Sequence, residues 1–406
     1  MKLLYFNYMA DLYGRSIGST IKAKKLLSNL ERAGHKVDYY WRFGGARKRP
    51  ETPSPARPPS PFRHFIRKLF YTPKTILQNN FEIIAEFVYI QKAKPELIIV
   101  RLDAFRISAV ILARLMNVPV LLEADGAMSY EWLHYHNDGA LWKSFLLFFE
   151  RIDIRLAEKI FVQSNVTKQY YVTTQAVRRE KITVITNAAD IPLRRKKMPP
   201  EVKEKINFPS GARVIGFIGS LHLWHGVDNL HRLMASLIPK YADLYFLFVG
   251  SGGPMTVKLR SQCQKGEWQH RVVFIDYLDH ELIPFCLEVM DIALAPYPDS
   301  GLFYYSPVKI FEYMAGGKVV VTTKVGQIAE IIQDGENGIF FDPNNNDDLE
   351  NKITRLLDNP SLGYRIGANA REFIAQGRTW KDKSRELEKL CLDYAKRSRK
   401  NISCTF

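Results

Sequence analysis

Three consecutive segments decide the fold: Ile292-Ala-Leu-Ala295, Pro307-Val-Lys-Ile-Phe-Glu-Tyr-Met-Ala315 and Val319-Val-Val-Thr322. The first and the last are short apolar runs, which are typical of parallel strands buried on both faces. The middle segment has proline in its first helical position, directly after Ser306, a residue type that favours the N-cap of a helix. The pattern therefore predicts a strand, a helix and a second, parallel strand.

The same alternation of apolar runs and helical segments continues in both directions along the chain. Further strands are expected at 213–218, 244–249, 272–275 and 338–341 in the second half, and at 3–8, 37–40, 97–100, 118–123, 159–163 and 182–186 in the first half. Short buried strands separated by helices predict an α/β protein with two doubly wound, Rossmann-like domains facing a central cleft. Ligands of such domains bind beyond the carboxyl ends of the strands.

A stretch rich in charge and proline, 191–211, predicts the linker between the two domains. We expect an N-terminal domain over 1–195, a C-terminal domain over 209–377, and a last helix within 378–406 that crosses back to the N-terminal domain.

Composition and charge exclude several classes of protein. The chain has 406 residues, 46% apolar and 25% charged, as in ordinary globular proteins. Its 58 Lys and Arg against 42 Asp and Glu give a net charge of +16, which predicts an anionic partner: nucleic acid, a phosphate-bearing ligand or an acidic membrane surface. The four cysteines form no C-x-x-C pair and have no Cys/His ligand spacing, so we expect reduced thiols and no metal site.

Half of the basic excess lies in residues 42–74, which hold nine Arg or Lys, one acid and seven of the 21 prolines. This composition is unsuited to a core helix or a central strand. Aromatic and basic residues alternate toward its end, which suits contact with anionic lipid headgroups; a solvated loop is the alternative. The residues expected to contact a membrane are Arg47, Lys48, Arg49, Phe62, Arg63, Phe65, Arg67, Lys68 and Phe70.

The sequence contains no run of 18 uncharged apolar residues, so no segment is expected to span a membrane. The apolar stretch at the N-terminus fits a first strand better than a signal peptide. We therefore expect a cytoplasmic protein, peripheral on the inner face of the cell membrane if 42–74 binds lipid.

Three glycine-containing loops follow predicted strands. Small residues there allow backbone N–H groups at the start of a helix to approach an anion. The positions expected to bind a ligand in these loops are Gly18, Gly219, Ser220, His225, Gly226 and Gly250. A plain turn between strand and helix is the alternative for each loop.

Lys309 and Glu312 lie three residues apart, on one face of the predicted helix and close to its start. A cation and free N–H groups at a helix start suit a diphosphate. A carboxylate one turn later suits a ribose, because it can accept hydrogen bonds from the two ribose hydroxyl groups. The alternative is an exposed ion pair, worth a few tenths of a kcal/mol.

The segment Ser306-Pro-Val-Lys309-Ile-Phe-Glu312-Tyr-Met-Ala-Gly-Gly317 resembles the donor-binding signature of glycosyltransferase family 4, whose members are retaining enzymes of the GT-B fold. Further similar segments are 219–228, 118–126 with Glu131 following, and Thr186-Asn-Ala-Ala-Asp190. The resemblance covers roughly residues 95–385, and its specific part is the C-terminal half.

The resemblance implies a hexosyltransferase that moves a sugar from a nucleotide-diphosphate donor, a UDP-sugar or a GDP-sugar, with retained configuration and with no metal or other cofactor. It implies that 1–195 binds the acceptor and 209–377 the nucleotide-sugar. A lipid-linked acceptor, in polysaccharide or glycolipid assembly, would explain the basic segment 42–74.

Site residues follow from the same resemblance, position by position. Glu312 would bind the ribose hydroxyls, and the diphosphate would lie on Ser306, Pro307, Val308 and Lys309, with Gly18 against the donor phosphate from the other domain. Tyr277 and Leu278 would bracket the base. Basic residues of many members are replaced here by Ser220 and His225, so neutralisation of the diphosphate would fall on Lys309 with help from His225.

Two residues are expected to take part in catalysis. Lys309 would stabilise the negative charge that grows on the leaving phosphate. Asp125, which follows the strand predicted over 118–123, would orient the acceptor hydroxyl or offset oxocarbenium charge. A turn beside Gly126 is the alternative for Asp125.

Two other functions stay open. A non-transferase enzyme of the same fold, such as a nucleotide-sugar epimerase, would alter the donor without an acceptor. A basic polyanion-binding protein would explain the charge of +16 but not the pairing of Lys309 with Glu312, and the sequence contains no nucleic-acid motif.

Overall fold

The computed structural model describes residues 1–8, 17–41, 71–135, 139–192, 197–222, 225–227, 230–250, 254–263, 269–276, 278–299 and 301–403. The chain forms two compact units, Met1–Thr186 with Lys381–Phe406, and Asn187–Trp380. The first boundary thus precedes the predicted linker 191–211. The reason is local packing, because the Asn187 Nδ2 donates to the Ser306 carbonyl oxygen at 2.5 Å and Ala189 is buried in the second unit's core.

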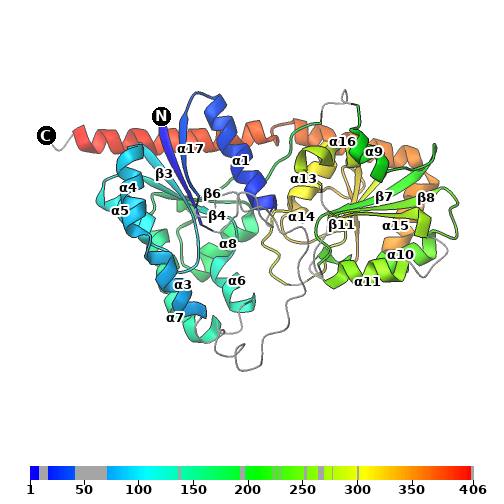
Figure 1. Ribbon diagram of the computed structural model, residues 1–406, viewed down its shortest axis with the longest axis horizontal. Coiled ribbons are helices and arrows are strands. Elements are labelled where there is room, and N and C mark those ends of the chain that lie inside the picture. The colour runs from blue at the N-terminus through cyan, green and yellow to red at the C-terminus, as the bar shows by residue number, and fades with distance from the viewer. Residues whose placement is uncertain are drawn as a thin grey trace. The chain divides into compact units, whose positions relative to one another are not determined.

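The first unit is built on a parallel sheet of six strands in the order β2-β1-β3-β4-β5-β6 (Figure 1). The strands are β1 (Lys2–Asn7), β2 (Lys36–Trp41), β3 (Leu97–Arg101), β4 (Val120–Ala124), β5 (Lys159–Val162) and β6 (Ile182–Val184). Both faces of β3 are buried, as its unbroken apolar sequence predicts.

Helices connect the strands of this unit. They are α1 (Ile17–Arg32), α3 (Tyr71–Asn80), α4 (Ile83–Ala93), α5 (Ser108–Leu115), α6 (Met128–Tyr135), α7 (Gly139–Leu156), α8 (Asn165–Thr174), the short helix η1 (Arg179–Lys181) and α17 (Trp380–Ser403). The long helix α17 lies beside α1 (Figure 1), where the Ser384 hydroxyl donates to the Leu26 carbonyl oxygen at 3.2 Å. The last helix therefore packs on the N-terminal unit.

The second unit also has a six-stranded parallel sheet, in the order β12-β11-β10-β7-β8-β9. The strands are β7 (Arg213–Ile218), β8 (Leu244–Val249), β9 (Val272–Ile275), β10 (Ile292–Ala295), β11 (Val319–Thr323) and β12 (Ile339–Phe341). The strand order reverses between β7 and β10, which are neighbours although three strands apart in sequence. In doubly wound sheets ligands bind at the carboxyl ends of strands at such a point.

The connections of the second unit are again helical. They are α9 (Pro200–Lys205), α10 (Leu230–Leu237), α11 (Pro254–Cys263), η4 (Gln269–Arg271), η5 (His280–Leu282), α12 (Ile283–Val289), α13 (Val308–Ala315), α14 (Ile328–Ile331), α15 (Asn346–Asp358) and α16 (Pro360–Ala375). The predicted α/β class, with two parallel sheets covered by helices, is confirmed.

No helix within the described ranges is long and apolar enough to cross a membrane. The thiols of Cys263, Cys286 and Cys391 are free and buried, and Cys404 lies outside the described residues.

Candidate functional site

Three loops meet closely at the carboxyl edge of the second sheet, at the point where the strand order reverses. A Cβ atom on Gly226 would lie 1.5 Å from the Pro296 carbonyl oxygen, and one on Gly250 would lie 2.5 Å from the Gly219 carbonyl oxygen. Gly226 and Gly250 also have φ values of +66° and +117°, which side chains rarely adopt. Only glycine fits these positions.

The ammonium group of Lys309, on α13, lies against the first of these loops. A Cβ atom on Gly219 would lie 2.6 Å from the Lys309 Nζ. The Nζ lies 4.3 Å from the centroid of the Phe217 ring and 5.6 Å from that of Tyr297. It is buried, and within the described part of the chain it has no hydrogen-bond partner. Burial lowers the pKa of Lys309 to about 7, against the opposing attraction of Glu312.

The backbone N–H groups of the two loop glycines are used by the sheet. The Gly219 N–H donates to the Val249 carbonyl oxygen and the Gly250 N–H to the Ile275 carbonyl oxygen, each at 2.8 Å. These two N–H groups are therefore not available to an anion. The absence of a side chain at Gly219 leaves space for the Lys309 ammonium. The absence of a side chain at Gly250 leaves space for the Gly219 backbone.

Helix α13 begins at Val308, with Pro307 and not Ser306 at the N-cap, so the predicted N-cap was wrong. The Ser306 hydroxyl instead accepts a hydrogen bond from the Asn187 N–H at 3.4 Å. This bond connects the residue before Pro307 to the first residue of the second unit. The Ile310 N–H donates to the Pro307 carbonyl oxygen at 3.1 Å, which leaves the N–H groups of Val308 and Lys309 at the helix start, where the helix dipole favours an anion. The Lys309 cation and this helix start thus lie on one element.

Glu312, one turn further along α13, forms an ion pair with His280, the first residue of η5. Their side chains are 15% and 30% exposed. The Tyr313 hydroxyl accepts from the Ile218 N–H at 2.7 Å, which fixes α13 against β7. Sequence reasoning missed His280, because it lies 32 positions before Glu312 and that separation carries no spacing signal.

The surroundings of His225 favour its neutral form in the protein without a ligand, and its predicted help in neutralising a diphosphate stays a prediction. Burial and the nearby Lys309 ammonium lower the pKa of His225 to about 3. Its Nδ1 lies 2.5 Å from the Ser220 carbonyl oxygen, which can only accept a hydrogen bond. The proton of the neutral ring is therefore on Nδ1, and Nε2 can only accept. Among the described residues of these loops and α13, Lys309 is the side chain that supplies positive charge.

The other predicted donor-binding residues are less informative. Leu278 is buried in the core of the second unit, and Tyr277 lies outside the described residues. Gly18 is the second residue of α1 in the first unit and is exposed. The predicted membrane-contact residues all lie outside the described residues: Arg47, Lys48, Arg49, Phe62, Arg63, Phe65, Arg67, Lys68 and Phe70.

Asp125 follows β4 at the carboxyl edge of the first sheet, inside a buried network of charges. Its carboxylate pairs with the Lys22 ammonium and, at 3.0 Å, with the Arg101 guanidinium. Lys22 also lies 2.9 Å from Glu123, whose other oxygen accepts from the Tyr5 hydroxyl at 2.6 Å. Burial alone would raise the pKa of Asp125, but Lys22 and Arg101 lower it. Asp125 is therefore an ionised, firmly held carboxylate.

Comparison with known proteins gives two family matches that follow one another along the chain. Residues 18–192 match the profile "Glycosyltransferase Family 4" and residues 199–373 match "Glycosyl transferases group 1". An uncharacterised glycosyltransferase of Methanocaldococcus jannaschii is 27% identical over 45% of this chain and 47% of that protein. The chain thus spans about half the length of the curated relatives it matches.

Two solved structures share the fold over nearly the whole chain. A glycosyltransferase from Rickettsia africae has a TM-score of 0.69 at 19% identity, covering 98% of each chain. The Anabaena protein HepE, in complex with UDP-glucose, has a TM-score of 0.63 at 17% identity, covering 96% of this chain and 99% of that one.

Proposed function

The chain belongs to the glycosyltransferases of the family 4 type, with the GT-B fold, and we propose that it transfers a sugar from a nucleotide-diphosphate donor with retention of anomeric configuration. The observation that carries the proposal is the buried Lys309 ammonium, which has no hydrogen-bond partner in the described residues and lies where the strand order of the second sheet reverses. UDP-sugars are the first donors to test and GDP-sugars the next, since UDP-glucose is bound in the Anabaena structure.

A diphosphate would supply the hydrogen-bond acceptors that the site lacks among the described residues. Its oxygens would accept from the Lys309 ammonium and from the N–H groups that open α13. Negative charge grows on the leaving phosphate as the bond to the sugar breaks, so a cation fixed beforehand in a dry site stabilises the transition state more than the ground state. Because Lys309 supplies this charge, we propose that the transfer needs no metal ion.

Glu312 would hold the ribose. The carboxylate lies one turn beyond Lys309, where it would repel a phosphate but would accept from two hydroxyl groups. The ion pair with His280 occupies one carboxylate oxygen, Oε1. We propose that His280 orients Glu312, and that the ribose hydroxyls bind to the other oxygen or displace the imidazole.

Asp125 would act as a fixed negative charge near the acceptor. Its lowered pKa makes it a poor proton acceptor, because Lys22 and Arg101 already stabilise the ionised form. The leaving phosphate is a better acceptor for the proton of the attacking hydroxyl. Asp125 would then orient that hydroxyl or offset oxocarbenium charge on the sugar.

The acceptor is proposed to be lipid-linked, in polysaccharide or glycolipid assembly, with the protein peripheral on the cytoplasmic face of the membrane. The basic segment 42–74 supports this, and so do apolar side chains on the helices that follow it. Leu77 on α3 is 60% exposed, Phe81 is 79% exposed, and Ile84 on α4 is 75% exposed. Exposed apolar groups next to cations are suited to the interface of an anionic bilayer.

Sedimentation with phosphatidylglycerol vesicles tests the membrane proposal. Deletion of 47–68, and separately Phe81→Ser with Ile84→Ser, should each reduce the bound fraction, and salt should weaken binding of the intact chain. Val257→Ser is the matched control, since this side chain is 73% exposed on α11 of the second unit. Equal sedimentation of all variants would rule out this role.

The activity is tested in two steps. In a thermal-shift panel of nucleoside diphosphates and nucleotide-sugars, a ligand at 100 times its Kd should add about 2.7 kcal/mol of stability. The donor so identified, labelled in its sugar, is then incubated with extracted membrane lipids. Label should enter the lipid fraction with the donor's anomeric configuration, measured by NMR. Change of the donor without lipid would indicate an epimerase, and no stabilising nucleotide would contradict the proposal.

A further inference from the structure

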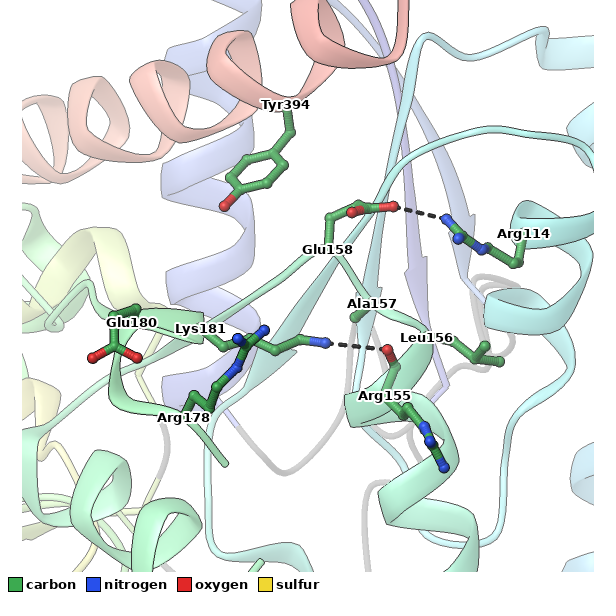
Figure 2. A pocket seen from close by; sticks show the side chains of 9 residues that line it. All are labelled: Arg114, Arg155, Leu156, Ala157, Glu158, Arg178, Glu180, Lys181 and Tyr394. Carbon is green, nitrogen blue, oxygen red and sulfur yellow. Dashed lines mark hydrogen bonds and ion pairs between the residues drawn. The ribbon is translucent and has the colours of Figure 1, made fainter. Parts of the chain in front are cut away.

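A second charged cavity lies at the amino-terminal edge of the first sheet, with a volume of about 410 Å³ (Figure 2). We call this cavity the amino-edge pocket. The residues that line it are Arg114, Arg155, Leu156, Ala157, Glu158, Arg178, Glu180, Lys181 and Tyr394. Glu158 directly precedes β5, and Lys181 directly precedes β6. Because all strands of this sheet are parallel, the pocket is at the opposite edge from Asp125, which follows the end of β4.

Four cations and two acids surround this cavity. Arg114 pairs with Glu158 at 3.0 Å, and the Lys181 ammonium donates to the Arg155 carbonyl oxygen at 3.1 Å. The Glu180 carbonyl oxygen accepts from Lys159, which anchors the η1 turn. Glu158 therefore has a cation of its own, and positive charge remains in excess.

Two guanidinium groups carry that excess. In the described part of the chain no ion pair joins Arg155 or Arg178 to a carboxylate. In Figure 2, Lys181 reaches toward the Arg155 carbonyl oxygen beside Arg178, the Arg155 side chain points downward and away from both, and Tyr394 of α17 points in from above. Burial lowers the pKa of Lys181, and the charges of Arg178 and Arg114 add to this against the pull of Glu158. An anion in the cavity would relieve this repulsion.

We infer that the amino-edge pocket binds a ligand that carries a phosphate group, separately from the donor site. A guanidinium group binds two phosphate oxygens at once, and Arg178 beside Lys181 offers such a group to a phosphate. The exposed Arg155 side chain, from a different element, would turn toward the same phosphate when it binds. The volume fits a small phosphorylated molecule. The same chemistry is offered by a free phosphate ester and by the headgroup of an anionic phospholipid.

The test measures binding of glycerol 1-phosphate by calorimetry, and of phosphatidylglycerol vesicles by sedimentation. The pocket variant Arg155→Ala with Arg178→Ala should weaken binding about 10- to 100-fold, because it removes both guanidinium groups that would hold the phosphate. Lys203→Ala with Lys205→Ala removes the same charge from exposed positions on α9 and should change little. Lys309→Met should leave this binding intact, which separates the pocket from the donor site.

The two binding measurements distinguish the possible ligands. Loss confined to glycerol 1-phosphate identifies a free phosphate ester as the ligand, and loss that includes the vesicles identifies a lipid headgroup. Equal binding by the pocket variant and the intact chain in both arms, or no binding in either arm, overturns the inference. Because both arginines are exposed, thermal unfolding of the pocket variant should stay near that of the intact chain.

Discussion

Each of the two sheets has a buried lysine near its carboxyl edge, and the two lysines differ in what surrounds them. The ammonium of Lys22, on α1, lies 5.6 Å from the centroid of the Phe161 ring and pairs with both Glu123 and Asp125. The ammonium of Lys309, on α13, also lies over an aromatic ring, but within the described residues no group accepts a hydrogen bond from it. Burial would lower the pKa of both, yet only that of Lys309 falls, because the two carboxylates raise that of Lys22.

The difference separates a structural cation from one that is ready for a ligand. In the Lys22 network the ammonium is matched by two acids, and those acids are held by Tyr5 and Arg101. The Nε and Nη1 atoms of Arg101 have no hydrogen-bond partner in the described residues, but its Nη2 pairs with Asp125. A buried charge that has no hydrogen-bond partner among the described residues destabilises the fold, and we propose that a ligand bound at the reversal of strand order compensates the Lys309 charge.

Lys22→Met should produce the largest loss of stability. It leaves Glu123 and Asp125 buried with one cation fewer, and breaking a buried pair in this way costs about 3–5 kcal/mol. Chemical denaturation gives the free energy of unfolding. Lys24→Met, at an exposed position of the same helix, is the control. A loss below about 1 kcal/mol for Lys22→Met would mean that the network contributes little.

Lys309→Met should have the opposite effect on stability and should remove activity. Replacing an unpaired buried charge by an apolar side chain of similar size should stabilise the ligand-free protein by about 1–4 kcal/mol at pH 6, while kcat should fall ~10²- to 10³-fold. The control Lys324→Met removes one exposed charge from the same unit. Destabilisation by Lys309→Met would contradict this account of the site.

Glu312→Ala should weaken nucleoside and nucleoside diphosphate alike. Two hydrogen bonds to a charged acceptor are lost, and a decrease of about 10²- to 10⁴-fold is expected for both ligands, since each such bond contributes ~1.5–3 kcal/mol. Lys309→Met should weaken only ligands with phosphates. Calorimetry with uridine and UDP distinguishes the two patterns. Identical patterns for both variants would show that Glu312 does not bind the ribose while Lys309 binds the phosphates.

The pH dependence of UDP binding should follow the ionisation of Lys309. A bound diphosphate favours the charged ammonium, so binding should weaken as pH rises above the pKa of about 7, by at most tenfold for each pH step of one. Because the folded-state pKa lies below the ordinary value, the stability of the free protein should rise with pH above 7, up to the ordinary lysine range. Titrations at pH 7, 8 and 9 test this, and Lys309→Met should show neither trend.

The contrast also shows what the sequence could and could not predict. The strands followed from continuous apolar runs, and Lys309 with Glu312 from their spacing on one helix, because both are local properties. The pairing of Lys22 with Asp125 joins residues 103 apart, and that of His280 with Glu312 joins residues 32 apart, so both depend on strand order. The neutral state of His225 depends on burial beside Lys309, which no local pattern encodes.

The Lys309 ammonium is buried without a hydrogen-bond partner among the described residues, and we propose that a diphosphate supplies the missing partner. The most direct measurement is the NMR titration of the Lys309 side chain, with the Lys309→Met spectrum to assign the signal, in the free protein and with saturating UDP. The account predicts a pKa near 7 in the free protein that returns toward the ordinary lysine value when UDP binds. An ordinary pKa in the free protein, or a lowered one that UDP does not change, would contradict it.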